Sequence, residues 1–136
     1  MLALCLPLLF CTRALAETPR AEQGVLDLRT WDFDRDGTLE LNGQWEFHWQ
    51  EFQTAKSKVD HFEEPAYMEL PGTWLGQDYR GKTLGPDGYA TYRLTVLLPD
   101  DPVDLGVRAR RVQSAFRLLI HGEKLMQAGR TGRSYA

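Results

Sequence analysis

Residues 39–49 alternate strictly between apolar and polar side chains, and this alternation constrains the fold more than any other feature of the chain. One parity carries Leu39, Leu41, Trp45, Phe47 and Trp49, and the other carries Glu40, Asn42, Gln44, Glu46 and His48. A period of two over this length predicts a β-strand with one buried face. Gly43 falls on the apolar parity, which predicts that a large ring from another strand lies across it or that the strand bulges there.

A second alternation spans residues 90–98 and ends at Pro99. Its apolar side chains are Ala90, Tyr92, Leu94, Val96 and Leu98, and its polar ones are Thr91, Arg93 and Thr95. Further strand patterns cover 25–29, 103–109, 116–120 and 124–128, with a tight turn at 121–123 and an Asp-Gly turn at 34–37. No strand–helix–strand order appears, although 49–58 could form one helical turn, so a parallel sheet is not expected. We predict an all-β antiparallel sandwich of six or seven strands, with Trp45, Phe47, Tyr92 and Leu94 pointing inward.

The first sixteen residues have the pattern of a secretory signal peptide. An apolar run at 2–10 precedes Ala14-Leu15-Ala16, which fits the small-x-small cleavage rule. The run is shorter than the roughly 20 apolar residues of a membrane helix. No basic residue precedes it, and a buried N-terminal helix is the alternative. We expect residues 1–16 to be the signal, 17–23 a linker and 24–136 the folded domain, whose mature form lacks cysteine because both lie in the signal.

Charge is unevenly distributed along the expected mature chain. Once Arg13 leaves with the signal, 15 basic and 19 acidic side chains remain, which gives a formal charge of −4. Residues 17–102 hold 8 basic and 17 acidic side chains, whereas residues 103–136 hold 7 and 2. The two halves could face each other in a sandwich. A nucleic-acid surface is the alternative, but no set of stacking aromatic residues is interleaved with the arginines, so we expect no nucleic-acid partner.

Four short blocks then occur in a characteristic order. They are Leu-Asn-Gly-Gln-Trp-Glu-Phe at 41–47, Leu-Pro-Gly-Thr-Trp at 70–74, Gly-Tyr-Ala-Thr-Tyr-Arg at 88–93 and Ile120-His121-Gly122. In this order they resemble galactose-binding-like jelly rolls over residues 24–133. One similar branch is the sugar-binding domain of family-two glycoside hydrolases. The chain resembles more closely the periplasmic N-terminal module of bacterial seven-transmembrane receptors with diverse intracellular signalling modules, through its signal peptide and the Leu-Asp-Leu-Arg-x-Trp segment at 26–31. His121 departs from the hydrolase branch, which usually has Asn there.

This resemblance implies a jelly-roll fold, here incomplete at the C-terminus, and a role in sensing a ligand. The expected ligand is a small molecule, such as a carbohydrate, and the expected partner is the remainder of a membrane receptor. The location would be periplasmic or extracellular, tethered to the membrane in a full-length parent. An accessory sugar-binding domain of a glycoside hydrolase is the alternative function. A third alternative is an interaction domain that docks by an open sheet edge. The chain alone is expected not to be an enzyme, because none of its blocks supplies a complete set of catalytic groups.

Residues 76–83 match the phosphate-loop pattern G-x-x-x-x-G-K-[ST] letter for letter. That chemistry needs a helix after the loop, so that the helix N-terminus faces the phosphates. Leu84-Gly85-Pro86-Asp87-Gly88 follows instead and cannot start a regular helix. We therefore interpret the stretch as a surface loop and expect no nucleotide partner.

The sequence contains no complete motif for metal binding or for catalysis. Residues 32–37 open like a calcium loop, but the twelfth position is Gly43, where a bidentate Glu is required. A turn is the expected structure, and a structural calcium ion with distant ligands is the alternative. The three histidines, His48, His61 and His121, are scattered without cysteine partners, which argues against zinc. The chain contains no G-x-S-x-G nucleophile elbow, and its loop carboxylates cannot be paired from sequence. We expect no cofactor.

Aromatic residues beside glycine-rich loops are the candidate ligand-binding groups. Trp74, Tyr79 and Tyr89 could stack on the face of a sugar at the rim of the sandwich, with Asp78, Arg80 or Asp87 bonding its hydroxyl groups. The alternative for Trp74 is a structural one, in which the ring closes the end of the sandwich. We call these six residues the loop rim.

Overall fold

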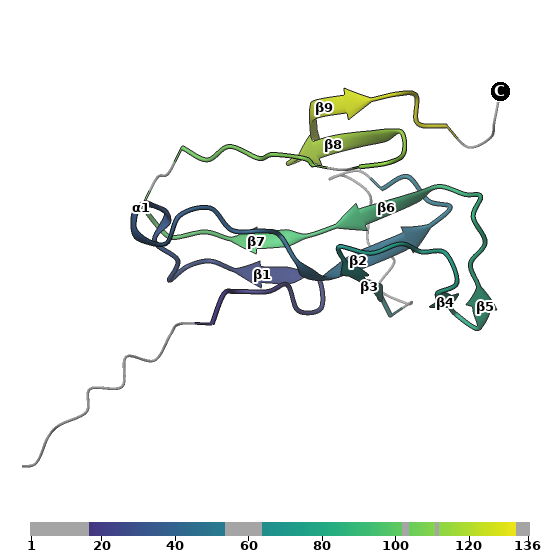
Figure 1. Ribbon diagram of the computed structural model, residues 1–136, viewed down its shortest axis with the longest axis horizontal. Helices are drawn as coiled ribbons and strands as arrows, with labels where there is room; N and C mark the ends of the chain where they lie inside the picture. The colour runs from purple at the N-terminus through teal and green to yellow at the C-terminus, as the bar shows by residue number, and fades with distance from the viewer. Residues whose placement is uncertain (1–16, 54–63, 102–103, 111, 133–136) are drawn as a thin grey trace, which may run out of the picture.

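The computed structural model describes residues 17–53, 64–101, 104–110 and 112–132 (Figure 1). The expected signal peptide lies outside these residues. The described part of the chain contains nine strands and one four-residue helix. In chain order these are β1 (Val25–Asp27), α1 (Phe33–Asp36), β2 (Gly43–Trp49), β3 (Ala66–Leu70), β4 (Asp78–Tyr79), β5 (Lys82–Thr83), β6 (Ala90–Arg93), β7 (Thr95–Leu97), β8 (Phe116–Ile120) and β9 (Glu123–Ala128). The all-β prediction is confirmed.

The strands form four small sheets, with β2 at the centre of the largest. β2 pairs antiparallel with β3 and β6, so that Phe47 lies opposite Ala66 on one side and Tyr92 on the other. β4 pairs with β5, and β8 pairs with β9, both antiparallel. β1 and β7 form the remaining sheet and run parallel, with Leu26 opposite Val96. The prediction of exclusively antiparallel pairing is wrong for this pair.

The parallel pair follows from how the chain enters β1. Glu22 and Val25 exchange two backbone hydrogen bonds of 2.9 Å across a two-residue turn at Gln23-Gly24, and both turn residues have positive φ. Such a turn reverses the chain tightly. Gly24 then accepts a hydrogen bond from the amide of Thr95, and pairing with β7 continues to Leu97. The alternation over 90–98 is therefore shared between two sheets, because β6 pairs with β2 and β7 pairs with β1.

Gly43 explains why the predicted strand at 39–49 begins four residues late. The backbone of Ala21 lies across Gly43, where an added Cβ would stand 2.3 Å from the Ala21 carbonyl oxygen. Ala21 also bonds Asn42 and Gln44 through its amide and carbonyl, each at 2.8 Å. A backbone, not a ring, therefore fills the space that the glycine leaves. Ala21 is only 2 % exposed, so the segment predicted as a linker contributes one residue to the core.

Two apolar clusters lie among the strands from β1 to β7, and neither includes a residue of the β8–β9 sheet. Ala21, Leu26 and Leu28 form the first, against which Trp45, Leu94 and Val96 pack among other apolar side chains. Phe47, Met68 and Leu84 form the second, with Trp49, Trp74, Tyr79, Ala90 and Tyr92 around it. The Phe47 and Tyr92 ring centroids lie 5.1 Å apart. The predicted inward direction of Trp45, Phe47, Tyr92 and Leu94 is confirmed.

The C-terminal part differs from this arrangement. Residues 104–110 are not a strand, and Leu105 and Val107 are exposed, so the strand predicted at 103–109 is wrong over its described residues. β8 and β9 form a hairpin closed by the predicted tight turn, in which His121 and Gly122 both have positive φ. This hairpin lies along the upper edge of the molecule in Figure 1, whereas β4 and β5 lie at its right-hand end.

Candidate functional site

β4 and β5 form a two-residue hairpin that carries part of the loop rim. Arg80 and Gly81 link the strands with φ of 55° and 78°, the left-handed geometry of a tight β-turn. The Asp78 carboxylate accepts a hydrogen bond of 3.1 Å from the Gly81 amide and braces the turn. Lys82 and Thr83 therefore lie in a strand. A phosphate-binding loop would place them at the start of a helix, so this stretch does not have that geometry.

Two of the rim aromatic residues are anchored in the second apolar cluster. The Trp74 ring packs edge-on against Trp49 at 5.5 Å, and the Tyr79 ring packs edge-on against Phe47 at 5.5 Å. Both remain half-buried. The Arg80 guanidinium lies 5.3 Å from the centre of the Tyr79 ring and donates a hydrogen bond of 3.3 Å to the Glu64 carbonyl oxygen. These ring contacts hold both side chains in place and leave part of each accessible.

Tyr89 occupies a different environment at the same end of β2. Its ring stacks on Phe52 with centroids 4.7 Å apart, and its carbonyl accepts a hydrogen bond of 2.8 Å from the Gln50 amide. The adjacent Gly88 lies against the Trp49 ring, where a Cβ would stand 2.1 Å from a ring carbon. Asp87 is exposed on this loop. The end of β2 therefore brings Trp74 and Tyr79 together through the cluster, with Tyr89 joined to the 50–53 segment instead.

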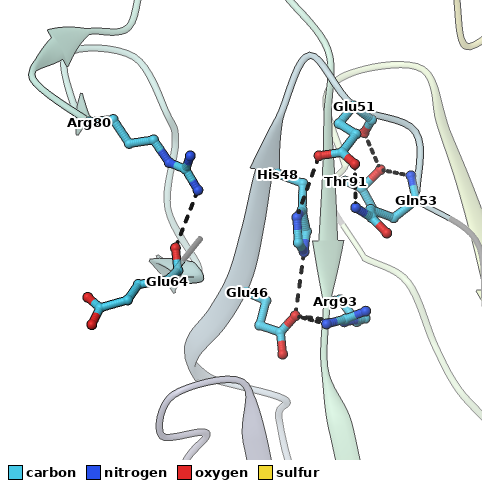
Figure 2. Close-up of polar contacts among 8 residues, drawn as sticks. All are labelled: Glu46, His48, Glu51, Gln53, Glu64, Arg80, Thr91 and Arg93. Carbon is cyan, nitrogen blue, oxygen red and sulfur yellow. Dashed lines mark hydrogen bonds and ion pairs between the residues drawn. The ribbon is translucent and has the colours of Figure 1, made fainter. Parts of the chain in front are cut away.

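Beside this rim lies a polar network that sequence reasoning did not single out (Figure 2). It comprises Glu46 and His48 on β2, Thr91 and Arg93 on β6, and Glu51 and Gln53 in the segment that follows β2. Arg93 donates from Nε to Glu46 Oε2 at 2.7 Å, and its terminal nitrogen forms an ion pair with the same oxygen. In register, Glu46 lies opposite Arg93 and His48 lies opposite Thr91. The sequence placed these four side chains on the polar parities, but it did not reveal this register.

The 50–53 segment folds back along β6 through this network. Gln50 has a φ of 55°, which turns the chain at the end of β2. The Thr91 hydroxyl donates to the Glu51 carbonyl oxygen at 2.7 Å and accepts from the Gln53 amide at 3.1 Å. The Gln53 side-chain amide donates to Glu51 Oε1 at 2.6 Å. These bonds place Phe52 where it can stack on Tyr89.

His48 stands between two carboxylates in this network. Its Nε2 lies 3.4 Å from Glu46 Oε2, and its Nδ1 lies 3.9 Å from Glu51 Oε2. The His48 side chain is 15 % exposed and that of Glu46 is 16 % exposed, whereas Glu51 is 58 % exposed. Nε2 is buried and makes no hydrogen bond within the described residues. Figure 2 shows the imidazole in line with both carboxylates, while Arg80 and Glu64 lie apart from the network.

Tyr92 and Asp27 have large pKa shifts with different physical causes. Burial against Phe47 raises the pKa of Tyr92 to about 12, because the phenolate would lose its hydration. On β1, hydrogen bonds from the Arg29 side chain and backbone lower the pKa of Asp27 to about 2. Asp27 is exposed, and Arg29 lies two residues further along the chain.

The residues at 32–37 that resemble a calcium loop contact one another and the neighbouring backbone. Asp32 caps α1 by accepting hydrogen bonds of 3.1 Å from the amides of Asp34 and Arg35, and Asp36 forms an ion pair with Arg35. These carboxylates are thus committed to backbone and guanidinium partners. Over the ranges that the structure describes, no three His, Cys, Asp or Glu side chains gather as metal ligands.

An open groove of about 540 Å³ lies away from the loop rim. It runs between residues 17–20 and 38–42, at the start of β2, whereas the rim lies at the end of β2. Arg20 beside it forms an ion pair with Glu69. This groove and the predicted ligand-binding side chains therefore lie at opposite ends of the central strand. Among the helices of the described residues, none has the length and apolarity needed to cross a membrane.

Comparison with known proteins found no matching protein-family model, no matching curated protein and no matching solved structure.

Proposed function

We propose that this chain is an extracytoplasmic ligand-sensing module, built on a galactose-binding-like jelly roll and belonging to a larger membrane receptor. The loop rim would bind the ligand, a carbohydrate, and the sheets would act as a rigid support. The all-β architecture and the inward-facing aromatic residues support this proposal. So does the order of the four sequence blocks described above.

The arrangement of the rim aromatic residues is the observation that carries the proposal. Trp74 and Tyr79 are held by ring contacts at 5.5 Å yet stay half-buried, and Tyr89 is half-buried on its Phe52 support. Rings fixed in this way lose little conformational entropy when a ligand stacks on them. The exposed side chains of Asp78, Arg80 and Asp87 on the neighbouring loops supply hydrogen-bonding groups for hydroxyls.

Titration with simple sugars and oligosaccharides, followed by tryptophan fluorescence and calorimetry, tests this function. We expect saturable binding that perturbs Trp74. Arg80→Gln should weaken binding about tenfold, because it removes a charged hydrogen-bond donor. The matched control is Lys82→Gln on the same hairpin, which removes an exposed charge outside the rim and should leave affinity unchanged. Folded protein that binds no member of a broad glycan panel would remove the carbohydrate assignment.

A further inference from the structure

His48 stands between two carboxylates, and the number of N–H donors on its ring decides how it can contact them. A neutral ring has one N–H donor and one lone-pair acceptor, whereas the imidazolium has two donors. Here Nε2 faces Glu46 at 3.4 Å and Nδ1 faces Glu51 at 3.9 Å. Whichever nitrogen carries the proton in the neutral ring, the lone pair of the other is directed towards a carboxylate. Only the protonated ring presents a donor to both.

The surrounding charges identify which of the two carboxylates would be attracted more strongly when His48 is protonated. Glu46 already accepts two contacts from Arg93, so its charge is largely compensated before His48 is protonated. Arg93 also opposes a second positive charge nearby. Glu51 Oε2 has no such cation in the described network, because its partner Gln53 is a neutral amide bonded to Oε1. The other side chains at this position are Thr91 opposite His48 and Tyr67 of β3 opposite Glu46 in the register.

We propose that His48 is a proton-operated latch that fastens the 50–53 segment to β2. Protonation draws the Glu51 carboxylate onto Nδ1, and Glu51 in turn holds Gln53 through Oε1. Phe52 lies between these two residues and supports the Tyr89 ring at 4.7 Å. The protonated latch therefore steadies one wall of the loop rim, and a lower pH tightens it.

The consequence for ligand affinity rests on the proposed function, but the latch itself does not. Histidine gains its proton between about pH 5 and pH 8. A ligand that stacks on Tyr89 would bind more tightly at the acidic end of this range. If the rim binds no carbohydrate, the latch still predicts a pH-dependent 50–53 segment in the free protein, so the two proposals fail separately.

Amide hydrogen exchange of the ligand-free protein tests the latch. The Gln53 amide, which donates to Thr91, reports whether the segment is fastened. Its protection factor, corrected for intrinsic exchange and divided by that of the Phe47 amide in β2, should be about two- to fivefold higher at pH 5.5 than at pH 8, the range for a partly exposed ion pair. His48→Gln and Glu51→Gln should each abolish this ratio change.

The matched control is His121→Asn, which removes an exposed histidine in the β8–β9 turn and keeps a side chain that tolerates positive φ. It should retain the full pH response of Gln53. A wild-type ratio that is equal at the two pH values would overturn the latch. So would a response that persists in either His48→Gln or Glu51→Gln, and the second variant keeps the test available if the first fails to fold.

Discussion

The segment from Arg20 to Leu97, here called the body, and the β8–β9 hairpin are both built from strands but differ in what stabilises them. Every buried residue in the described ranges lies in the body, and the buried apolar side chains are divided between its two apolar clusters. The hairpin packs extensively on itself and only marginally on other strands. Ile120 and Leu125 in the hairpin are 42 % and 53 % exposed. A two-residue turn joins its strands, whose register shifts once between Leu118 and Leu119, whereas the body depends on contacts between distant residues.

This difference shows that strand formation and core formation depend on different features of the same sequence. The His121-Gly122 turn supplies the two left-handed residues that a tight hairpin needs, and β8 and β9 pair around it. Burial needs partners from other segments, as when Ala21 closes on Gly43. We therefore expect substitutions in the body to cost much more than equivalent ones in the hairpin.

Phe47→Ala should give the largest effect. Phe47 is 1 % exposed and contacts the rings of Trp49, Tyr79 and Tyr92. Its removal should lower the free energy of unfolding by about 3–5 kcal/mol, as for other buried phenylalanines. Leu118→Ala in the half-buried face of β8 is the hairpin counterpart and should cost about 1 kcal/mol or less. Urea unfolding measures both, and equal losses would refute the distinction between body and hairpin.

Gly43→Ala should give the next largest effect. Its φ is 119°, and the new Cβ would collide with the Ala21 backbone. We expect a loss of about 2–3 kcal/mol in the free energy of unfolding, combining backbone strain with displacement of Ala21. Gly76→Ala is the control, because its φ is also positive at 78° but an added Cβ meets no atom within 4 Å. It should cost about 1 kcal/mol. Similar losses at both glycines would show that the Ala21 contact is unimportant.

Alkaline pH should weaken the body through Tyr92. Because its pKa is raised from 10 to about 12 in the folded state, the contribution of its neutral form is complete below pH 10. That contribution is lost as pH rises from 10 towards 12. The free energy of unfolding, measured by urea titration at pH 9 and pH 11.5, should fall more in the wild type than in Tyr92→Phe. An identical fall in the wild type and in Tyr92→Phe would show that the Tyr92 hydroxyl is exposed to solvent in the folded state.

Acid should have the smallest effect, through Asp27 on β1. Its pKa is lowered from 3.8 to about 2, so its contribution to stability is present above pH 4 and is lost as pH falls towards 2. Because the ion pair with Arg29 is exposed, the effect should be slight. Asp27→Asn should show a slightly smaller loss of thermal stability between pH 4 and pH 2 than the wild type. A larger loss of thermal stability in Asp27→Asn would contradict the predicted stabilising effect of the ionised Asp27.

The parity of β2 and β6 could be predicted because alternation records which face of a strand is buried. Phe47 and Tyr92 accordingly pack together. The parallel pairing of β1 with β7 could not be predicted, since three-residue strands contain no information about their partner. The strand predicted from the alternation of Leu105 and Val107 does not form. An apolar pattern forms a strand only when another strand is available to pair with it.

The candidate site shows the same limit. The loop rim is a prediction from positions beside glycine turns, and the structure shows that Trp74 and Tyr79 both pack against the second cluster. Sequence alone shows His48 as a polar residue of the strand and as one of three scattered histidines that do not favour zinc, because its partners depend on register and on the turn at Gln50. Glu51 follows β2 directly, yet only the fold places it over Thr91. Polar residues of matched parity on two strands were the available signal.

The most direct test of the account follows urea unfolding by two-dimensional NMR, with separate peaks for β2 and β9. We predict that the backbone peaks of Glu123 to Ala128 shift or vanish at a lower urea concentration than those of Gly43 to Trp49. The reason is that only β2 is fixed by both apolar clusters. A single midpoint shared by both strands would show that the hairpin is an integral part of one cooperative core, and would contradict the division proposed here.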